Sequence, residues 1–479
     1  MVVVNETPVV HRSVDRQVRG WSRWAPETSF LWIGFFAGLL FLLVTPPFQV
    51  ADESRHFVRA YTISEEILGK LGWIPSHERL PASAVAAIEA MDYMRFDPTA
   101  KTTPGHTLAL MAHQLEPDKR ASYGETTAYS PASYLPQLAP MLLCRLLGLN
   151  AVITLYAARF CALLFWLAVT YWAIRKLPVA KHLLFFIALL PMTIFQAGSL
   201  SADCAALSLS FLLVAYYLHV AHRATPVDRR TMLLLSGLGA LLTAAKLVYA
   251  PLIGLHFLIP PSRFRSRRAY LLSFALTALL CVVTVVLLYG NFLTPFFTPS
   301  PTAVSSPDVA SPTPYPQLNF LLAEPLNAPR VAVATAVKFG RMYMDGFVGL
   351  LGWSCASLPS YLYVVTIIML LLTALTTDSR WLIRPWHKLL FVGISLLITA
   401  SIGLALTTDT GLNNKPTLLL LGIQGRYFTP FAPLLGLLAV NRSRLMNRYG
   451  RYVRAAVRPF IVFLLLNALY CLIHHYYEL

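Results

Sequence analysis

The sequence predicts an all-α polytopic membrane protein. Hydrophobic residues make up 56% of the 479-residue chain and charged residues only 13%, whereas charged residues form about 25% of a typical soluble domain. Many apolar residues fall in runs of about 17 to 25, the length that a helix needs to cross a bilayer. The net charge of +17 does not indicate a nucleic-acid partner, because the basic residues form short clusters between these runs, as in cytoplasmic loops.

The apolar runs predict about eleven transmembrane helices. The prediction divides the chain into a cytoplasmic N-terminal segment at 1–28, a first transmembrane helix at 29–48, a first outer loop at 49–152, a transmembrane core at 153–290, a second outer loop at 291–358 and C-terminal transmembrane helices at 359–474. The first helix is too long for a signal-peptide core, so we expect it to remain as an anchor. The stretch 231–260 is predicted to cross twice, as a hairpin with Lys246 at its outer tip.

Lysine and arginine predict the orientation. The N-terminus and five linkers hold 22 of the 39 basic residues but only five acidic ones, so the positive-inside rule places them in the cytoplasm. The first outer loop holds 11 of the 22 acidic residues. We expect both outer loops to carry interfacial helices. Residues 134–149, which include two prolines and Arg145, should lie along the membrane rather than cross it. The Pro-rich segment 294–316 should be extended or mobile.

Polar side chains gather at the outer ends of the predicted helices. Asp52 and Glu53 follow the first helix after the turn "PPFQ", and Asp203 lies in the next outer turn, "QAGSLSADC". Further candidates occur at later outer positions: Lys246, Arg341, Gln424, Arg426 and Tyr427. Carboxylates and cations at one membrane surface suit a reaction between a lipid-linked phosphate and a polar acceptor.

Each of these residues also has a simpler explanation. Polar residues at helix ends are commonly interfacial, and Arg426 would then pair with a carboxylate such as Asp203. His56 lies one turn beyond Asp52, where it would orient the carboxylate, share a metal ion or make an ordinary hydrogen bond. Arg59 lies on the same predicted segment. The residues themselves leave these alternatives open.

Several segments resemble a bacterial membrane-protein family catalogued as a domain of unknown function. They are "PPFQVADESRHFVRAYTISE", "YSPASYLPQLA", "YAARF", "LPMTIFQAGSLSAD", "AKLVYAPL" and "GIQGRYFTPFAPLL". Together they extend from about residue 30 to 440. That family is in turn similar to the GT-C superfamily, whose members are glycosyltransferases that use polyprenyl-phosphate sugars.

The resemblance implies a GT-C-like fold and roles for individual residues. The acidic residue in the first outer loop, here Asp52, is the expected catalytic base, and Asp203 matches a second acidic position. Cations at outer helix ends, here Lys246 and Arg426, are expected to hold the lipid phosphate. The chain departs from the family at Ala51 and Ser54, where members more often have prolines, and it lacks the soluble C-terminal domain of the oligosaccharyltransferases.

We therefore expect an inverting hexosyltransferase in the bacterial inner membrane with its active site facing the periplasm. It would move a sugar from an undecaprenyl-phosphate donor to a cell-envelope glycan such as the O-antigen of lipopolysaccharide. Glu53 would assist Asp52, and both would hold any divalent metal, Mg²⁺ or Mn²⁺. The expected substrate-binding residues are His56, Arg59, Lys246, Arg341, Gln424, Arg426 and Tyr427. The alternatives are a transporter or flippase for a lipid-linked sugar, and a glycan ligase.

Overall fold

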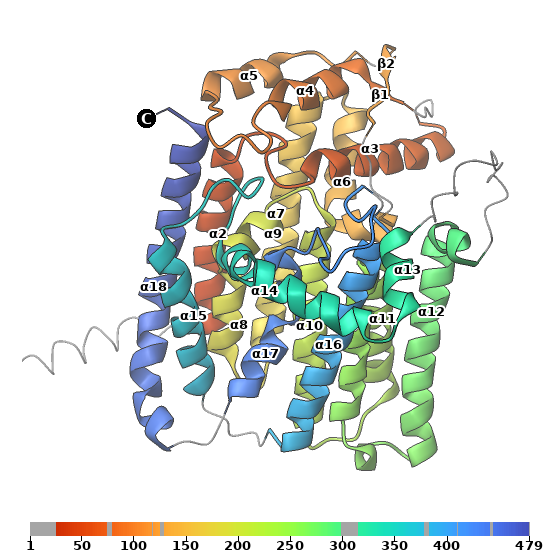
Figure 1. Ribbon diagram of the computed structural model, residues 1–479, viewed down its shortest axis with the longest axis vertical. Coiled ribbons are helices and arrows are strands. Elements are labelled where there is room, and N and C mark those ends of the chain that lie inside the picture. The colour runs from red at the N-terminus through yellow and green to blue at the C-terminus, as the bar shows by residue number, and fades with distance from the viewer. Residues whose placement is uncertain are drawn as a thin grey trace, which may run out of the picture.

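The computed structural model describes residues 25–73, 79–116, 118–124, 129–297, 315–377, 383–409, 411–440 and 444–478. Regular structure in these ranges is almost entirely helical, as predicted; β1 (Leu80–Pro81) and β2 (Arg120–Ala121) form a small antiparallel pair. Long helices stand side by side along the vertical axis of Figure 1, and shorter helices cover their upper ends. Most of the predicted N-terminal segment 1–28 and of the Pro-rich segment 294–316 lies outside the described residues.

Six helices in the described ranges are long and apolar enough to cross a membrane. They are α2 (Pro26–Val44), α7 (Ala151–Lys176), α10 (Ala202–His222), α12 (Arg267–Phe297), α16 (Pro385–Thr407) and α18 (Arg444–Tyr476). α12 exposes apolar side chains such as Val286 and Leu287, which are 61% and 76% exposed. A helix satisfies its own backbone hydrogen bonds, so such a face is stable against lipid. The chain is therefore a helical membrane protein.

Shorter elements run beside these long helices. They are α8 (Lys181–Ala188), α9 (Pro191–Ala197), α11 (Arg229–Ala245), the 3₁₀ helices η2 (Leu247–Leu258) and η3 (Pro261–Arg263), α15 (Ser360–Leu375), η4 (Gly425–Phe431) and α17 (Ala432–Ala439). Pro191 separates α8 from α9, because proline has no N–H to continue the helical bonding pattern. The predicted hairpin over 231–260 consists of α11 and η2, which meet at Lys246.

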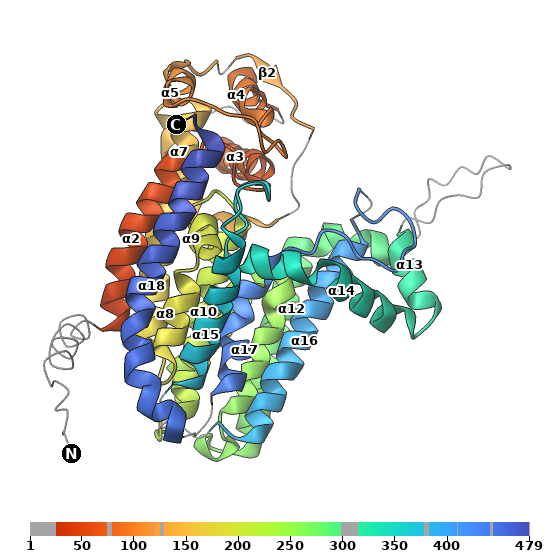
Figure 2. The same cartoon turned by 60° about the vertical axis from the view of Figure 1, so that its left-hand side comes forward.

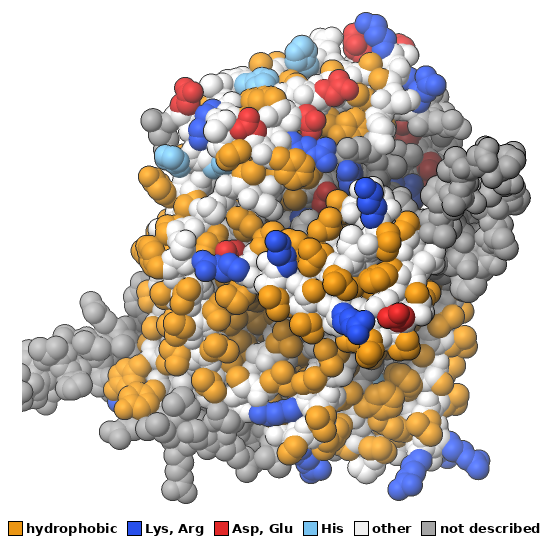
Figure 3. Space-filling model, in the orientation of Figure 1, with side chains coloured by type: hydrophobic (Ala, Val, Ile, Leu, Met, Phe, Trp, Pro, Cys, Tyr) orange, Lys and Arg blue, Asp and Glu red, His pale blue; other side chains and the backbone are white. Residues whose placement is uncertain are grey.

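The first outer loop forms a layer over the upper ends of the long helices. Its helices are α3 (Glu53–Lys70), α4 (Ala82–Asp92), α5 (Pro104–Ala112), η1 (Pro131–Tyr134) and α6 (Leu135–Leu146). Most acidic side chains on the face in Figure 3 belong to this upper part, while Lys and Arg mark the lower edge.

α6 covers most of residues 134–149, which were expected not to cross the membrane. It has 12 residues, too few to cross, and it packs against α7. Arg159 of α7 donates to the carbonyls of Thr45 and Pro46, just past the end of α2. The turns of α7 before Arg159 therefore extend beyond α2, and α6 covers them.

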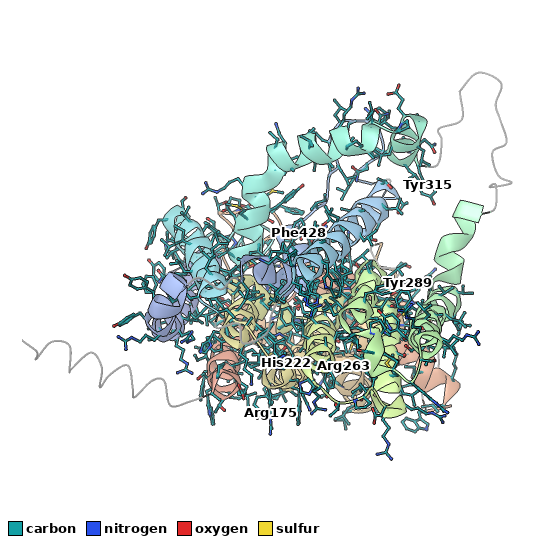
Figure 4. The ribbon with its side chains drawn as sticks, turned by 90° about the horizontal axis from the view of Figure 1, so that it is seen from below. Arg175, His222, Arg263, Tyr289, Tyr315 and Phe428 are labelled. Carbon is teal, nitrogen blue, oxygen red and sulfur yellow. The ribbon has the colours of Figure 1, made fainter. Side chains whose placement is uncertain are left out.

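The second outer loop supplies α13 (Pro316–Ala323) and α14 (Asn327–Val348). α14 lies across the long helices in Figures 1 and 2, and from below it runs along one side of the bundle (Figure 4). A surface helix was predicted in this part of the loop. α14 packs on η4 at Gly425, where a Cβ atom would overlap the backbone of Tyr343 and Phe347, so only glycine allows this close approach.

The orientation prediction is testable by cysteine labelling. Ala90 lies in the upper layer and Arg265 in the linker before α12. In intact cells we expect an impermeant thiol reagent to label Ala90→Cys and not Arg265→Cys, because the Arg-rich linkers stay in the cytoplasm. Both variants belong in a background without the six native cysteines. The opposite labelling pattern would invert the orientation.

Candidate functional site

Asp52, the first residue of the candidate site, lies between α2 and α3. It has a left-handed backbone conformation, with φ of 65°, and directly precedes the first residue of α3. Such a conformation costs a residue other than glycine about 1 to 3 kcal/mol, and it persists only where surrounding contacts require it. The turn after Pro46 and Pro47 thus fixes Asp52 at the end of α2.

Two carboxylates and two cations form a continuous network across four elements. Arg426 of η4 donates through Nη2 to Asp52 Oδ2 at 2.8 Å, and its Nε lies 3.6 Å from Asp203 Oδ2. Asp203, in the first turn of α10, accepts a hydrogen bond of 2.5 Å from Lys246 Nζ. The structure thus brings together four of the residues expected from the sequence. Their formal charges cancel, and Asp52 is the most exposed, at 27% against 6 to 13% for the others.

Three tyrosines surround the Lys246 ammonium group. Its Nζ lies 4.9 Å from the ring centroid of Tyr427, 5.7 Å from that of Tyr129 and 5.9 Å from that of Tyr249. Ring faces at this distance attract a cation. Sequence reasoning identified Tyr427 but missed Tyr129 and Tyr249, although both lie in segments that carry the family resemblance.

The protonation states of Asp52 and His56 follow from their surroundings. Burial is the largest single influence and would raise the pKa of the Asp52 carboxyl, but Arg426, His56 and Arg55 together outweigh it and hold that pKa below its ordinary value. His56 is buried, and its Nδ1 lies 2.8 Å from the Tyr134 hydroxyl. Burial lowers the pKa of His56 to about 4. At neutral pH Asp52 is charged and His56 is neutral.

His56 predicts a pH dependence of stability. The unfolded chain protonates this side chain near pH 6.5, whereas the folded protein does so only near pH 4. Between these values the unfolded state binds more protons, so the free energy of unfolding falls as the pH is lowered from 6.5 toward 4. We expect the unfolding temperature in detergent to fall over this range, and less steeply in His56→Gln. The control is exposed His113→Gln; equal slopes in wild type and His56→Gln would contradict the prediction.

Glu53 points away from this network into the protein core. It accepts hydrogen bonds from Arg159 Nε at 2.9 Å and Nη2 at 2.5 Å, and from the backbone N–H of Leu200 at 3.0 Å. Neither Glu53 nor Arg159 has exposed side-chain surface. Both oxygens of Glu53 are therefore occupied, and we assign it a structural role in place of the expected role beside Asp52.

A Mg²⁺ or Mn²⁺ site shared by Asp52 and Glu53 does not fit these contacts. The two proposed ligands bind different arginines, Asp52 to Arg426 and Glu53 to Arg159. In the part of the chain that the structure describes, no three His, Cys, Asp or Glu side chains gather as a metal site would require. We therefore derive no step through a metal.

The remaining candidates have different surroundings. Arg59 donates through Nε to the carbonyl of Tyr129 at 3.1 Å, so it positions this tyrosine. Gln424 lines a cavity of about 40 Å³ beside Arg426. Arg341 is not part of the network: it is 59% exposed and pairs with Asp345, one turn away on α14. Arg159 was not among the predicted residues, although an arginine within an apolar run is itself a signal.

An apolar groove of about 300 Å³ lies below the site, between α8, α14, α15 and the η4–α17 segment. Tyr343, Phe347 and Phe428 line its upper part, where α14 crosses, and Leu371 and Ala374 line it farther along α15. Residues of α14 and η4 line both this groove and the small cavity beside Arg426. The groove therefore leads from the level of the charged network into the apolar part of the bundle.

The family model described as "Predicted membrane protein (DUF2142)" matches residues 35–435. The matched range contains Asp52, Asp203, Lys246 and Arg426, and it ends before α18. No curated protein and no solved structure matches the chain.

Proposed function

The chain belongs to the DUF2142 family of predicted membrane proteins, and we propose that it is a membrane glycosyltransferase of the GT-C type. It transfers a sugar, with inversion, from a polyprenyl-phosphate donor to a cell-envelope glycan such as O-antigen. The observation that carries the proposal is the position of Asp52: an ionised, partly exposed carboxylate that pairs with Arg426, in a network that also holds Asp203 and Lys246, above an apolar groove.

In the proposed reaction Asp52 is the general base. It removes the proton from the acceptor hydroxyl, whose oxygen attacks the anomeric carbon as the bond from that carbon to the phosphate oxygen breaks. The leaving group is the polyprenyl phosphate. Lys246 and Arg426 stabilise its negative charge.

The ion pairs suggest how donor binding prepares the base. In the free protein Arg426 pairs with Asp52, and its charge lowers the pKa of that carboxyl. A donor phosphate that takes over the guanidinium of Arg426 weakens this pair. Asp52 then becomes a stronger base at the moment when the donor is in place.

The apolar groove is the proposed site of the polyprenyl chain. It begins at α14 and η4, next to Arg426, and continues along α15. A lipid phosphate bound by Arg426 and Lys246 would place its chain in this groove. The glycan acceptor would approach Asp52 from the upper layer.

The proposal includes a specific membrane topology. Besides the six long helices, we propose that five further segments cross: α8 with α9, α11, η2, α15, and η4 with α17. This gives the eleven crossings predicted from the sequence. The site then lies on the outer side of a bacterial cytoplasmic membrane.

Two alternatives remain distinct from this proposal. A transporter or flippase commonly holds its substrate near the bilayer midplane on broken helices, whereas Asp203 and Lys246 lie at helix ends. A glycan ligase would use the same cations but would transfer a whole glycan. The position of the charged network favours transfer over transport.

The proposal is tested with the full chain in lipid nanodiscs. The substrates are a radiolabelled undecaprenyl-phosphate hexose and a membrane glycan fraction. We expect label in the glycan and release of undecaprenyl phosphate. Passage of the intact donor across vesicles, without bond cleavage, would overturn the proposal in favour of transport. Consumption only of a diphosphate-linked glycan would replace it with ligation.

The proposed phosphate contacts predict the effect of removing each cation. Lys246→Ala and Arg426→Ala should each weaken binding of the polyprenyl-phosphate donor by about 10-fold or more, the value of one charged hydrogen bond. Donor titration by tryptophan fluorescence measures this. Exposed Arg330→Ala on α14 is the charge-matched control. Unchanged affinity in folded Lys246→Gln and Arg426→Gln would exclude the contacts.

A further inference from the structure

A polar cavity lies at the end of the bundle opposite the charged network. Its volume is about 310 Å³, and its walls come from the start of α8, the end of α15 and Arg454 of α18. These parts of α8, α15 and α18 lie at the bottom of Figures 1 and 2. The cavity is large enough to hold a small ligand group.

Two cations, Lys181 and Arg454, line the cavity together with the imidazole of His182. The charges that act on His182 are those of Arg454, Arg458 and Lys181. Within the described part of the chain, one carboxylate pairs with the lining cations: Glu27, whose Oε1 lies 3.6 Å from Lys181 Nζ. The positive charge of the cavity is therefore only partly compensated by these contacts.

Among the described residues, part of the hydrogen-bonding capacity of the cavity is unused. Arg454 Nη1 donates to the carbonyl of Thr376 at 3.3 Å, which holds the guanidinium in place. Among the described residues, the other nitrogens of Arg454 and the ring nitrogens of His182 have no protein partner. α8 begins directly after Ala180, which has a left-handed φ of 57° and also lines the cavity. The first N–H groups of a helix attract anions.

We propose that this cavity binds the phosphate group of a phosphate ester. Arg454 and Lys181 supply the charge, and His182 with the start of α8 supplies further donors. The apolar groove lies next to the cavity: Leu183 and Ala374 line the groove, one residue away from His182 and Thr373 of the cavity. A phosphate here therefore has an apolar surface beside it, which favours an anionic lipid headgroup over a soluble phosphate.

This site is separate from the one proposed for transfer. It lies at the other end of α8 and α15, and its residues do not touch Asp52, Asp203, Lys246 or Arg426 in the described contacts. Its test therefore needs no glycosyltransferase activity, and its failure would leave the proposed reaction unaffected.

The test is lipid binding to the full chain, measured by native mass spectrometry in detergent. We expect phosphatidylglycerol to bind the wild type more tightly than phosphatidylcholine, and Arg454→Gln to weaken phosphatidylglycerol binding by about 10-fold or more. Exposed Arg451→Gln, one turn earlier on α18, is the matched control with the same charge change. His182→Gln is a second variant, which leaves both Lys181 and Arg454 in place. Its affinity for phosphatidylglycerol should also be lower than that of the wild type.

The outcomes separate the possible ligands. Equal binding of both lipids by wild type, or equal losses in Arg451→Gln and Arg454→Gln, would overturn the proposal. Glycerol phosphate competes with the lipid if the cavity recognises phosphate itself. If glycerol phosphate binds as tightly as the lipid, and Arg454→Gln weakens both, the phosphate site stands and its ligand is a soluble ester.

Discussion

Replacement of Asp52 by Asn is expected to lower the rate of sugar transfer by about 10²- to 10⁴-fold, the usual cost of removing a positioned general base. Asparagine tolerates a left-handed backbone conformation, so the variant should keep the φ of 65° found at this position. It also releases Arg426 from its ion pair. Donor affinity should therefore be maintained or increased while turnover is lost.

Single-turnover kinetics in nanodiscs measure this effect, with the donor titrated separately. Asp92→Asn, an exposed position on α4 that pairs with Arg95, is the matched control and should transfer sugar at the wild-type rate. Near-normal turnover of Asp52→Asn would remove the base assignment. Asp203 would then be the next carboxylate to test, although Lys246 already binds it.

Arg159→Ala is expected to have the largest effect on stability. The substitution leaves Glu53 buried without its cationic partner, a change that typically costs about 3 to 5 kcal/mol. It also removes the hydrogen bonds to the carbonyls of Thr45 and Pro46. We expect a lower unfolding temperature in detergent and loss of transfer, because these contacts fix the turn that positions Asp52.

A double variant separates the buried charge from the loss of packing. Glu53→Leu with Arg159→Met places no charge in the core, so it should be more stable than Arg159→Ala. Arg175→Ala, at the exposed end of the same helix, is the control and should unfold at the wild-type temperature. An unfolding temperature of Arg159→Ala equal to that of wild type would show that the pair does not stabilise the fold.

The different roles of the adjacent carboxylates Asp52 and Glu53 could not be predicted from the sequence. Asp52 and Glu53 were expected to act together, because neighbouring acids after one turn look equivalent in a sequence. At the start of α3 their side chains point in different directions, one toward Arg426 and the other toward Arg159. The partners lie far away along the chain, so no local pattern distinguishes the two roles.

Arg341 and Arg426 look alike in the sequence but have different surroundings in the structure. Both are cations in outer segments and both were expected to bind substrate. Arg341 pairs with Asp345 on its own helix and stays exposed, whereas Gly425 allows α14 and η4 to touch and places Arg426 between Asp52 and Asp203. Only the packing of these two elements decides which arginine enters the network.

The sequence by itself determined the helical membrane character of the protein and the positions of Asp52, Asp203, Lys246 and Arg426. Runs of apolar residues and isolated charges can be recognised locally in a sequence. The bilayer requires about the same length of every helix that crosses it, and a charged side chain inside it always costs free energy. The tertiary structure alone decided that Arg426 joins two carboxylates, that Glu53 belongs to the core and that three tyrosines surround Lys246. These features depend on contacts between distant segments, and such contacts form only when the helices pack.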